Sequence, residues 1–329
     1  MGYKLTRIAP TPSGFLHLGN IFSFAITAGM ARRSSAEILL RVDDLDRERV
    51  QREYVEDIFD TLRFMEIPWD RGPRGYDEFE REYSQVHRLS MYRGALARLR
   101  EAGVVFACDC SRAKILRASR DGGYAGTCRE RGLSLDADGV SWRLRTEDAA
   151  GDLPAALRIN GYAEGVIEAD LPVEMRDFVV RKKDGFPAYQ LSSVVDDLHY
   201  GVDLIVRGQD LWASTRAQLY LSYALDAEAF RDITFCHHRL LVTGAGEKLS
   251  KSAGATSIRF LRQQGLSAAE IYALIAREIV GAGPAGDAAA AAGDAAALAP
   301  GRDVDALALG RAAAGVRDWA GLAALVLDL

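Results

Sequence analysis

The 329 residues of this chain lack several features whose presence would place it in a specialised class of protein. No apolar run is long enough to cross a bilayer, and the opening residues 1–7 contain no apolar core of a secretory signal. A net charge of −5 argues against a broadly basic, nucleic-acid-binding coat, although a local basic groove remains compatible with it. We therefore expect a cytoplasmic protein that is not bound to a membrane.

The first third of the chain alternates strand and helix signals. This order is typical of βαβ units and predicts an α/β fold with a doubly wound parallel sheet. Residues 1–103 would form the first half of this α/β domain. The signals are an apolar strand at 3–9, a helix at 21–30, a buried strand at 38–42, a helical stripe at 55–62 and a helix at 91–102 that Gly103 ends.

The pattern changes at about Val104, where short strand-like pieces such as 142–145 and 178–181 stand between polar, Gly-rich turns. We interpret residues 104–185 as an inserted subdomain. The second half of the α/β domain would follow at 186–252, with sheet-like signals at 189–195 and 204–206 and a helix near 215–225.

The last part of the chain is predicted to be mostly helical. Within a helical segment at 253–281, Ser267 and Glu270 form a capping-box pattern, flanked by Leu266 and Ile271 as a hydrophobic staple. Residues 282–329 are rich in Ala and Gly. They predict a flexible linker at 284–300 and a terminal helix within 303–327 that has no function of its own.

Two short segments carry most of the chemistry. Residues 10–20 form a Gly-containing turn with His17, between a strand and a helix, where an imidazole and backbone N–H groups can meet a phosphate. Residues 248–252, Lys-Leu-Ser-Lys-Ser, supply two lysines on a loop suited to the same phosphates. Either segment alone has a plainer reading, in which the histidine caps a helix and the lysines are solvated.

Together and in this order, the two segments resemble the HIGH and KMSKS signatures of class I aminoacyl-tRNA synthetases. The resemblance implies a Rossmann-like catalytic domain and adenylate chemistry that depends on positioning and electrostatic stabilisation. It implies catalytic roles for His17, Asn20, Lys248 and Lys251, and ATP binding by His17, Gly19 and Lys251. Mg²⁺ is expected with ATP.

Further motifs resemble the glutamyl branch of that class. Residues 7–17, Arg-Ile-Ala-Pro-Thr-Pro-Ser-Gly-Phe-Leu-His, are similar to its RxAPSPTGxLH opening, and residues 41–49 to its RIEDTDxxR segment. Tyr189 with Asp196–Asp197 is similar to YxxxxxVDD, and residues 207–210 to RGxD. The similarity runs from Lys4 to about Ser252.

This resemblance implies a glutamate site whose guanidiniums pair with the substrate carboxylates. Arg7 would contact a carboxylate, Tyr189 and Arg207 would hold the amino acid, and Asp43 would receive its α-ammonium. The alternative is that the arginines are ion-paired scaffold residues. The full expected set for glutamate is Arg7, Ala9, Thr11, Asp43, Tyr189 and Arg207.

Asp43 departs from the glutamyl pattern, which usually has Glu at this place. The shorter side chain keeps the charge but retracts it. Glutaminyl-tRNA synthetases carry Asp here, so that branch stays open as a competitor.

Three of the four cysteines fall in one short stretch, at Cys108, Cys110 and Cys128. In a reducing compartment this clustering favours a metal over disulfides. Zinc needs four ligands, so either water or Tyr124 would complete the set. The CxC…YxxxC pattern resembles the zinc site of the glutamyl-Q tRNA(Asp) synthetase family, which implies one structural zinc held by Cys108, Cys110, Tyr124 and Cys128. Cys236 is interpreted as a core residue.

The segment from Ala253 to Leu329 has no room for the anticodon-binding domain of full glutamyl-tRNA synthetases. The same family lacks that domain, activates glutamate without tRNA, and attaches it to queuosine in the anticodon of tRNA(Asp). We expect a monomer that uses L-glutamate, ATP and queuosine-bearing tRNA(Asp). The alternatives are a truncated glutamyl-tRNA synthetase that charges the 3′ end, and a non-catalytic tRNA-binding paralogue.

Overall fold

The computed structural model describes residues 2–119, 121–146, 156–241, 257–281 and 315–327. The chain divides into two compact units, each of which is described by itself. Unit 1 consists of Met1–Gln85, Asp203–Gln209 and Cys236–Leu329, and unit 2 of Val86–Val202 and Asp210–Phe235. The expected insertion at 104–185 lies inside unit 2, which begins earlier in the chain and ends later. The boundaries of the insertion stay a prediction.

Unit 1 is built on parallel strands, as the βαβ pattern predicts. β1 (Leu5–Ile8) pairs in parallel with β2 (Glu37–Leu40) along its whole length, and with β8 (Leu204–Gly208) through Thr6 and Leu204. β9 (Thr234–His238), whose last three residues belong to this unit, lies next to β8 in the strand order. In a parallel sheet the carboxyl ends of all strands lie at the same end of the sheet. Ligands of α/β proteins bind at that end.

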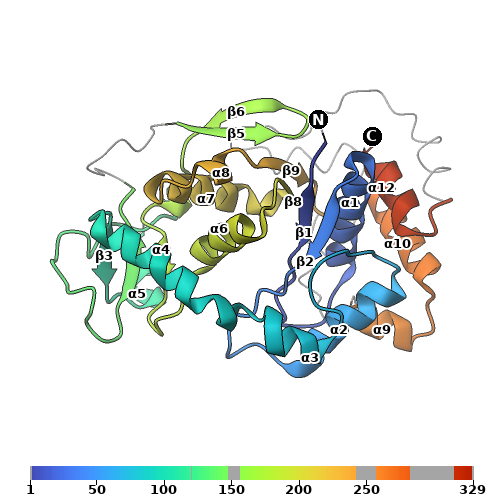
Figure 1. Cartoon of the computed structure of the whole chain (residues 1–329), viewed down its shortest axis with the longest axis horizontal. Coiled ribbons are helices and arrows are strands. Elements are labelled where there is room, and N and C mark those ends of the chain that lie inside the picture. The colour runs from blue at the N-terminus through green and yellow to red at the C-terminus, as the bar shows by residue number, and fades with distance from the viewer. Residues whose placement is uncertain (1, 120, 147–155, 242–256, 282–314, 328–329) are drawn as a thin grey trace. The chain divides into compact units, whose positions relative to one another are not determined.

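Helices of unit 1 cover this sheet, with α1 (Leu18–Ser34) buried along most of its length (Figure 1). The C-terminal helix α12 (Trp319–Leu327) packs on α1 so closely that a Cβ on Gly29 would lie 2.3 Å from the Cβ of Ala323. The terminal helix that the sequence predicts therefore completes the core around α1. The described residues of this unit also form helices α2 (Arg52–Phe64), α3 (Tyr76–Glu78), α9 (Ile258–Gln263) and α10 (Ala268–Gly281).

Unit 2 combines a three-stranded sheet and a β-hairpin with helices. β3 (Val105–Cys108), β4 (Ser141–Leu144) and β7 (Val179–Arg181) form an antiparallel sheet in the order β3-β4-β7. β5 (Leu157–Gly161) and β6 (Gly165–Ala169) form a hairpin, and β5 also pairs with Thr234 and Phe235. The helices are α4 (Leu89–Glu101), α5 (Arg112–Ala118), α6 (Tyr189–Tyr200), α7 (Trp212–Ala224) and α8 (Glu228–Arg231).

The sheet-like interpretation of residues 189–195 is wrong, because these residues begin helix α6. The helix ends at Gly201, which adopts the left-handed conformation of a C-terminal cap at φ 73°. On its buried face, Asp196 accepts from Arg88 Nε at 2.8 Å and from the Tyr92 hydroxyl at 2.7 Å. These two hydrogen bonds join α6 to α4. Burial raises the pKa of Tyr92, and the nearby carboxylate charge raises it further.

Other local predictions are confirmed. Glu270 accepts from the Ser267 N–H at 2.8 Å at the start of α10, as a capping box requires. Cys236 is buried in the core of unit 1. The predicted linker at 284–300 lies outside the described residues.

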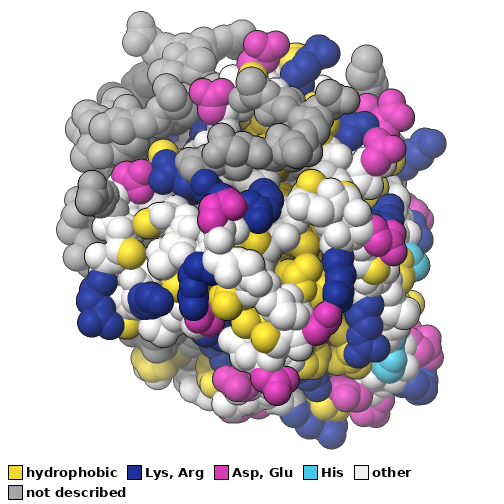
Figure 2. Space-filling model, turned by 90° about the vertical axis from the view of Figure 1, so that its left-hand side faces the viewer, with side chains coloured by type: hydrophobic (Ala, Val, Ile, Leu, Met, Phe, Trp, Pro, Cys, Tyr) yellow, Lys and Arg dark blue, Asp and Glu magenta, His cyan; other side chains and the backbone are white. Residues whose placement is uncertain are grey.

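The surface of the described part carries charges of both signs. Figure 2 shows Lys and Arg side chains interspersed with Asp and Glu on one face, with hydrophobic side chains between them. Among the described residues, no helix is long and apolar enough to span a bilayer.

Candidate active site

The turn that precedes α1 is held by reciprocal hydrogen bonds between His17 and the first turn of the helix. His17 Nδ1 accepts from the Gly19 N–H at 3.1 Å, and the His17 N–H donates to Asn20 Oδ1 at 3.0 Å. Because Nδ1 is an acceptor, the neutral ring carries its proton on Nε2. His17 thus caps the helix and keeps an N–H donor on the other side of its ring.

Two neighbours fix the position of this turn. A Cβ on Gly19 would lie 3.0 Å from Cε1 of His17, so glycine lets the imidazole lie close over the helix start. Asp57 on α2 accepts from the Leu16 N–H at 3.1 Å, directly before His17. Burial raises the pKa of Asp57, although the bond from Leu16 and nearby arginines partly oppose this shift. The sequence alone gave no sign of the contact between Asp57 and Leu16.

Arg7 and Arg207 lie on the same face of the unit 1 sheet. Side chains alternate along a strand, and Ile8 and Val206 belong to the core cluster that contains the buried face of α1. Arg7 and Arg207 therefore face the other side. Both arginines are buried, and Arg7 Nη1 donates to the Val206 carbonyl at 3.3 Å.

Asp43 is brought to the same strand ends by the chain that leaves β2. The Asp43 N–H donates to the Pro10 carbonyl at 2.9 Å, which places Asp43 beside the turn that contains Ala9 and Thr11. Its carboxylate accepts from Arg41 Nε at 2.7 Å and from Nη2 at 3.1 Å. A carboxylate has about four lone-pair sites, so Asp43 can pair with Arg41 and still receive an ammonium.

Two adjacent histidines near the end of β9 face opposite sides. His238 Nδ1 donates to the Arg239 carbonyl at 2.8 Å, so its Nε2 accepts from the Ser23 hydroxyl of α1 at 2.9 Å. His237, one residue earlier, therefore faces the side of Arg7 and Arg207. Burial, followed by the charges of Arg207, His238 and Arg7, lowers the pKa of His237 to about 2. No motif in the sequence predicts a role for His237.

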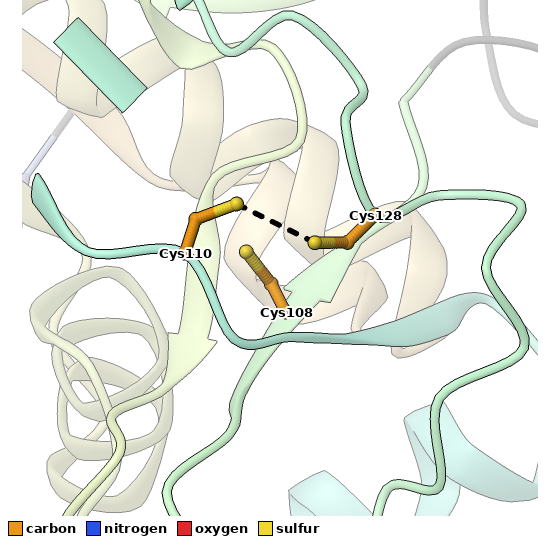
Figure 3. Close-up of side chains that lie close together, drawn as sticks. All are labelled: Cys108, Cys110 and Cys128. Carbon is orange, nitrogen blue, oxygen red and sulfur yellow. Dashed lines mark hydrogen bonds between the residues drawn. The ribbon is translucent and has the colours of Figure 1, made fainter. Parts of the chain in front are cut away.

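The three clustered cysteines converge in unit 2. Their sulfur atoms lie within 4.8 Å of one another, and Cys110 Sγ and Cys128 Sγ are 3.5 Å apart (Figure 3). The Tyr124 oxygen lies 3.4 Å from Cys108 Sγ and accepts from the Cys128 N–H at 2.8 Å. Zinc–thiolate bonds of about 2.3 Å in a tetrahedron require sulfur separations of this order, so the donor set fits zinc.

The electrostatics of the cysteine cluster also suit a cation. Burial opposes ionisation of Cys108, but hydrogen bonds from Tyr124 and the Cys110 N–H outweigh it, and the pKa of Cys108 falls to about 7. Burial and the neighbouring Cys128 raise the pKa of Cys110 to about 11. Three thiolates this close repel one another unless a positive ion is among them. Arg131 Nη1 donates to Cys128 Sγ at 3.2 Å and would support a thiolate ligand there.

Comparison of the sequence with known proteins identifies its relatives. A family model described as tRNA synthetases class I (E and Q), catalytic domain, matches residues 5–289. A protein of Dechloromonas aromatica named glutamyl-Q tRNA(Asp) synthetase is 37% identical over 258 residues, which cover 77% of this chain and 79% of that protein. One of Nocardia farcinica with the same name is 38% identical over 82% of each chain.

The chain belongs to the glutamyl-Q tRNA(Asp) synthetase family of class I synthetases.

More distant relatives support the fold. A protein of Nitrosococcus oceani named glutamate–tRNA ligase 2 is 34% identical over 79% of this chain but only 56% of its own length. The crystal structure of a glutamate–tRNA synthetase from Elizabethkingia anophelis superposes with a TM-score of 0.61 at 20% identity, covering 77% of this chain and 53% of that one. The class I fold is thereby confirmed, and membership of this family makes the protein a ligase.

The residues predicted to form the class I site divide among three parts of the chain. Unit 1 brings together Arg7, Asp43 and Arg207 at the strand ends, and it also holds the His17 turn. Tyr189 lies at the first turn of α6, in unit 2. Lys248 and Lys251 lie outside the described residues, so their roles stay predictions.

Proposed function

We propose that this enzyme activates L-glutamate with ATP to glutamyl adenylate and transfers the glutamyl group to queuosine in tRNA(Asp). The observation that carries this proposal is the placement of two buried arginines, Arg7 and Arg207, on one face of a parallel sheet, with a carboxylate at the same strand ends. A dicarboxylic amino acid presents two anions and one cation, and this set matches it in sign and number.

Within the proposal, the glutamate carboxylates pair with the arginines, and Asp43 receives the α-ammonium. Arg41 holds Asp43 through two hydrogen bonds, which fixes the carboxylate for its partner. Ala9 and Thr11, in the same unit, would complete this set, and the role of Tyr189 in holding the amino acid stays a prediction.

ATP would lie against the start of α1. Backbone N–H groups at a helix N-terminus favour phosphate, and the Nε2–H of His17 adds a donor beside them. Negative charge on the phosphate oxygens grows as the glutamate carboxylate attacks the α-phosphorus and pyrophosphate leaves. Preorganised donors stabilise that charge, and Lys248 and Lys251 are proposed to supply the remaining positive charge. Mg²⁺ would accompany the triphosphate.

The proposed metal is one zinc ion with a structural role. Cys108, Cys110 and Cys128 would hold it, with the Tyr124 oxygen as the fourth ligand. When bound, zinc would cross-link the end of β3 to the segment around Cys128. A site filled by four protein ligands leaves no position for a substrate.

The proposed acceptor rests on the names of the relatives. Two proteins of which the chain covers about four fifths are named for tRNA(Asp). Single-stranded loops can present individual bases, so an anticodon nucleoside is a chemically reasonable acceptor. The monomeric state and a cytoplasmic location remain predictions of the sequence.

Pyrophosphate exchange tests the activation step. Purified protein, ATP and labelled pyrophosphate should give labelled ATP with glutamate and no tRNA, and much less with glutamine or aspartate. Replacement Lys251→Ala should abolish the exchange. Exchange that requires tRNA would favour the truncated glutamyl-tRNA synthetase, exchange with glutamine alone would favour the glutaminyl branch, and no exchange under either condition would favour the non-catalytic paralogue.

A further inference from the structure

His237 is a second histidine of unit 1 that faces the candidate glutamate site. Its neighbour His238 is bonded to Ser23 on α1, and Phe22 of the same helix packs edge-on against the His238 ring at 5.1 Å. Alternation along β9 then turns His237 to the opposite side of the sheet. Arg7 and Arg207 face that side as well, because their neighbours Ile8 and Val206 belong to the core with α1.

The three side chains are close enough to interact electrostatically. Burial is the largest cause of the lowered pKa of His237, and the positive charges of Arg207 and Arg7 act in the same direction. His237 is therefore a neutral ring on the strand next to that of Arg207, and Arg7 lies one strand further away. A neutral imidazole carries one N–H donor, which can bind an anion without adding a third positive charge.

We propose that His237 is a substrate-binding residue that donates a hydrogen bond to the glutamate carboxylate paired with Arg207. This role rests on the function proposed above and adds a third donor to that site. One guanidinium fills at most two of the about four lone-pair sites of a carboxylate, and a neutral donor on the same face can fill another.

The test compares the two adjacent histidines by pyrophosphate exchange at varied glutamate and ATP. His237→Ala should raise the KM for glutamate by about 10-fold or more, as expected for a lost hydrogen bond to a charged group. The KM for ATP and kcat should stay within about twofold, because the interaction is made equally in the ground and transition states. His238→Ala should lower the melting temperature and leave the KM for glutamate unchanged.

Conservative replacements distinguish binding from a merely structural effect. His237→Asn and His237→Gln place an amide N–H near the positions of Nδ1 and Nε2, so one of them should restore most of the affinity for glutamate. Calorimetric titration of glutamate should rank the variants in the same order.

An unchanged KM in His237→Ala, or an equal loss in all three variants together with a lower melting temperature, would overturn the role of His237. A wild-type protein without glutamate-dependent exchange would overturn the proposed function itself. The two failures are thus separate results.

Discussion

Arg41 and Asp43 form a buried, two-point ion pair, with hydrogen bonds of 2.7 and 3.1 Å, directly after strand β2. Residues two apart on an extended chain face the same side, which is how the pair forms within one segment. Asp43 consequently has two tasks, since it neutralises a buried guanidinium and offers a carboxylate at the strand ends.

Replacement Asp43→Asn should therefore cost stability as well as activity. Arg41 would lose a buried counter-charge, and breaking a buried ion pair by removing one partner typically costs about 3 kcal/mol. The matched control is Asp46→Asn, whose pair with Arg49 is exposed and 3.8 Å long, and which should change stability by less than about 0.5 kcal/mol. Urea unfolding measures the free energy of unfolding of both variants. Equal losses in the two variants would contradict a stabilising role of the buried ion pair.

Asp57 should make stability depend on pH in an unusual direction for a carboxylate. Its pKa is raised in the folded protein, chiefly by burial, so it stabilises the fold most below its unfolded pKa of about 3.9. That contribution is lost as the pH rises through the folded pKa. Asp57→Asn keeps an acceptor for the Leu16 N–H and removes the buried charge.

The stability of Asp57→Asn relative to wild type should accordingly rise between about pH 4 and pH 7. Asp57→Leu, which leaves the Leu16 N–H without an acceptor, should be less stable at both pH values. Melting temperatures across this range measure the trend. If the stability of Asp57→Asn relative to wild type fell as the pH rose, the result would contradict a raised pKa of Asp57.

Local patterns in the sequence predict the parts of the fold that depend on neighbours in the chain. The capping box at Ser267 and Glu270, the parallel strands of unit 1 and the convergence of the cysteines are of this kind. Helix α6 was not predicted because its Val-Val and Leu residues are typical of a strand. Gly201, which caps the C-terminus of α6, was the signal in the sequence that indicates a helix end there. The bond between Arg88 and Asp196 joins residues 108 positions apart, which no local pattern shows.

The cysteine cluster predicts one bound metal ion per chain. Cys128→Ser should lose the metal in elemental analysis, whereas Cys236→Ser should retain it, because Cys236 is buried in the separate core of unit 1. Tyr124→Phe decides whether the phenol or a water is the fourth ligand. Phenol ligation predicts a zinc affinity at least about 10-fold weaker in competition with a chelator. Equal metal content in the two cysteine variants would contradict the site.

The close contact between α1 and α12 gives a packing prediction. Gly29→Ala should cost about 1–3 kcal/mol by overpacking against Ala323, and the added replacement Ala323→Gly should recover part of that loss. Gly94→Ala on α4 is the control, since a Cβ there meets no atom within 4 Å and should stabilise the helix by up to about 1 kcal/mol. Additive effects of the two α1–α12 changes in denaturant unfolding would rule out the contact.

Glutamyl transfer to defined tRNAs tests the central claim most directly. Radiolabelled glutamate, ATP and the enzyme should label tRNA(Asp) that carries queuosine, and should leave tRNA(Asp) without queuosine and tRNA(Glu) unlabelled. Equal labelling of tRNA(Asp) with and without queuosine, or labelling of tRNA(Glu), would contradict the proposed acceptor.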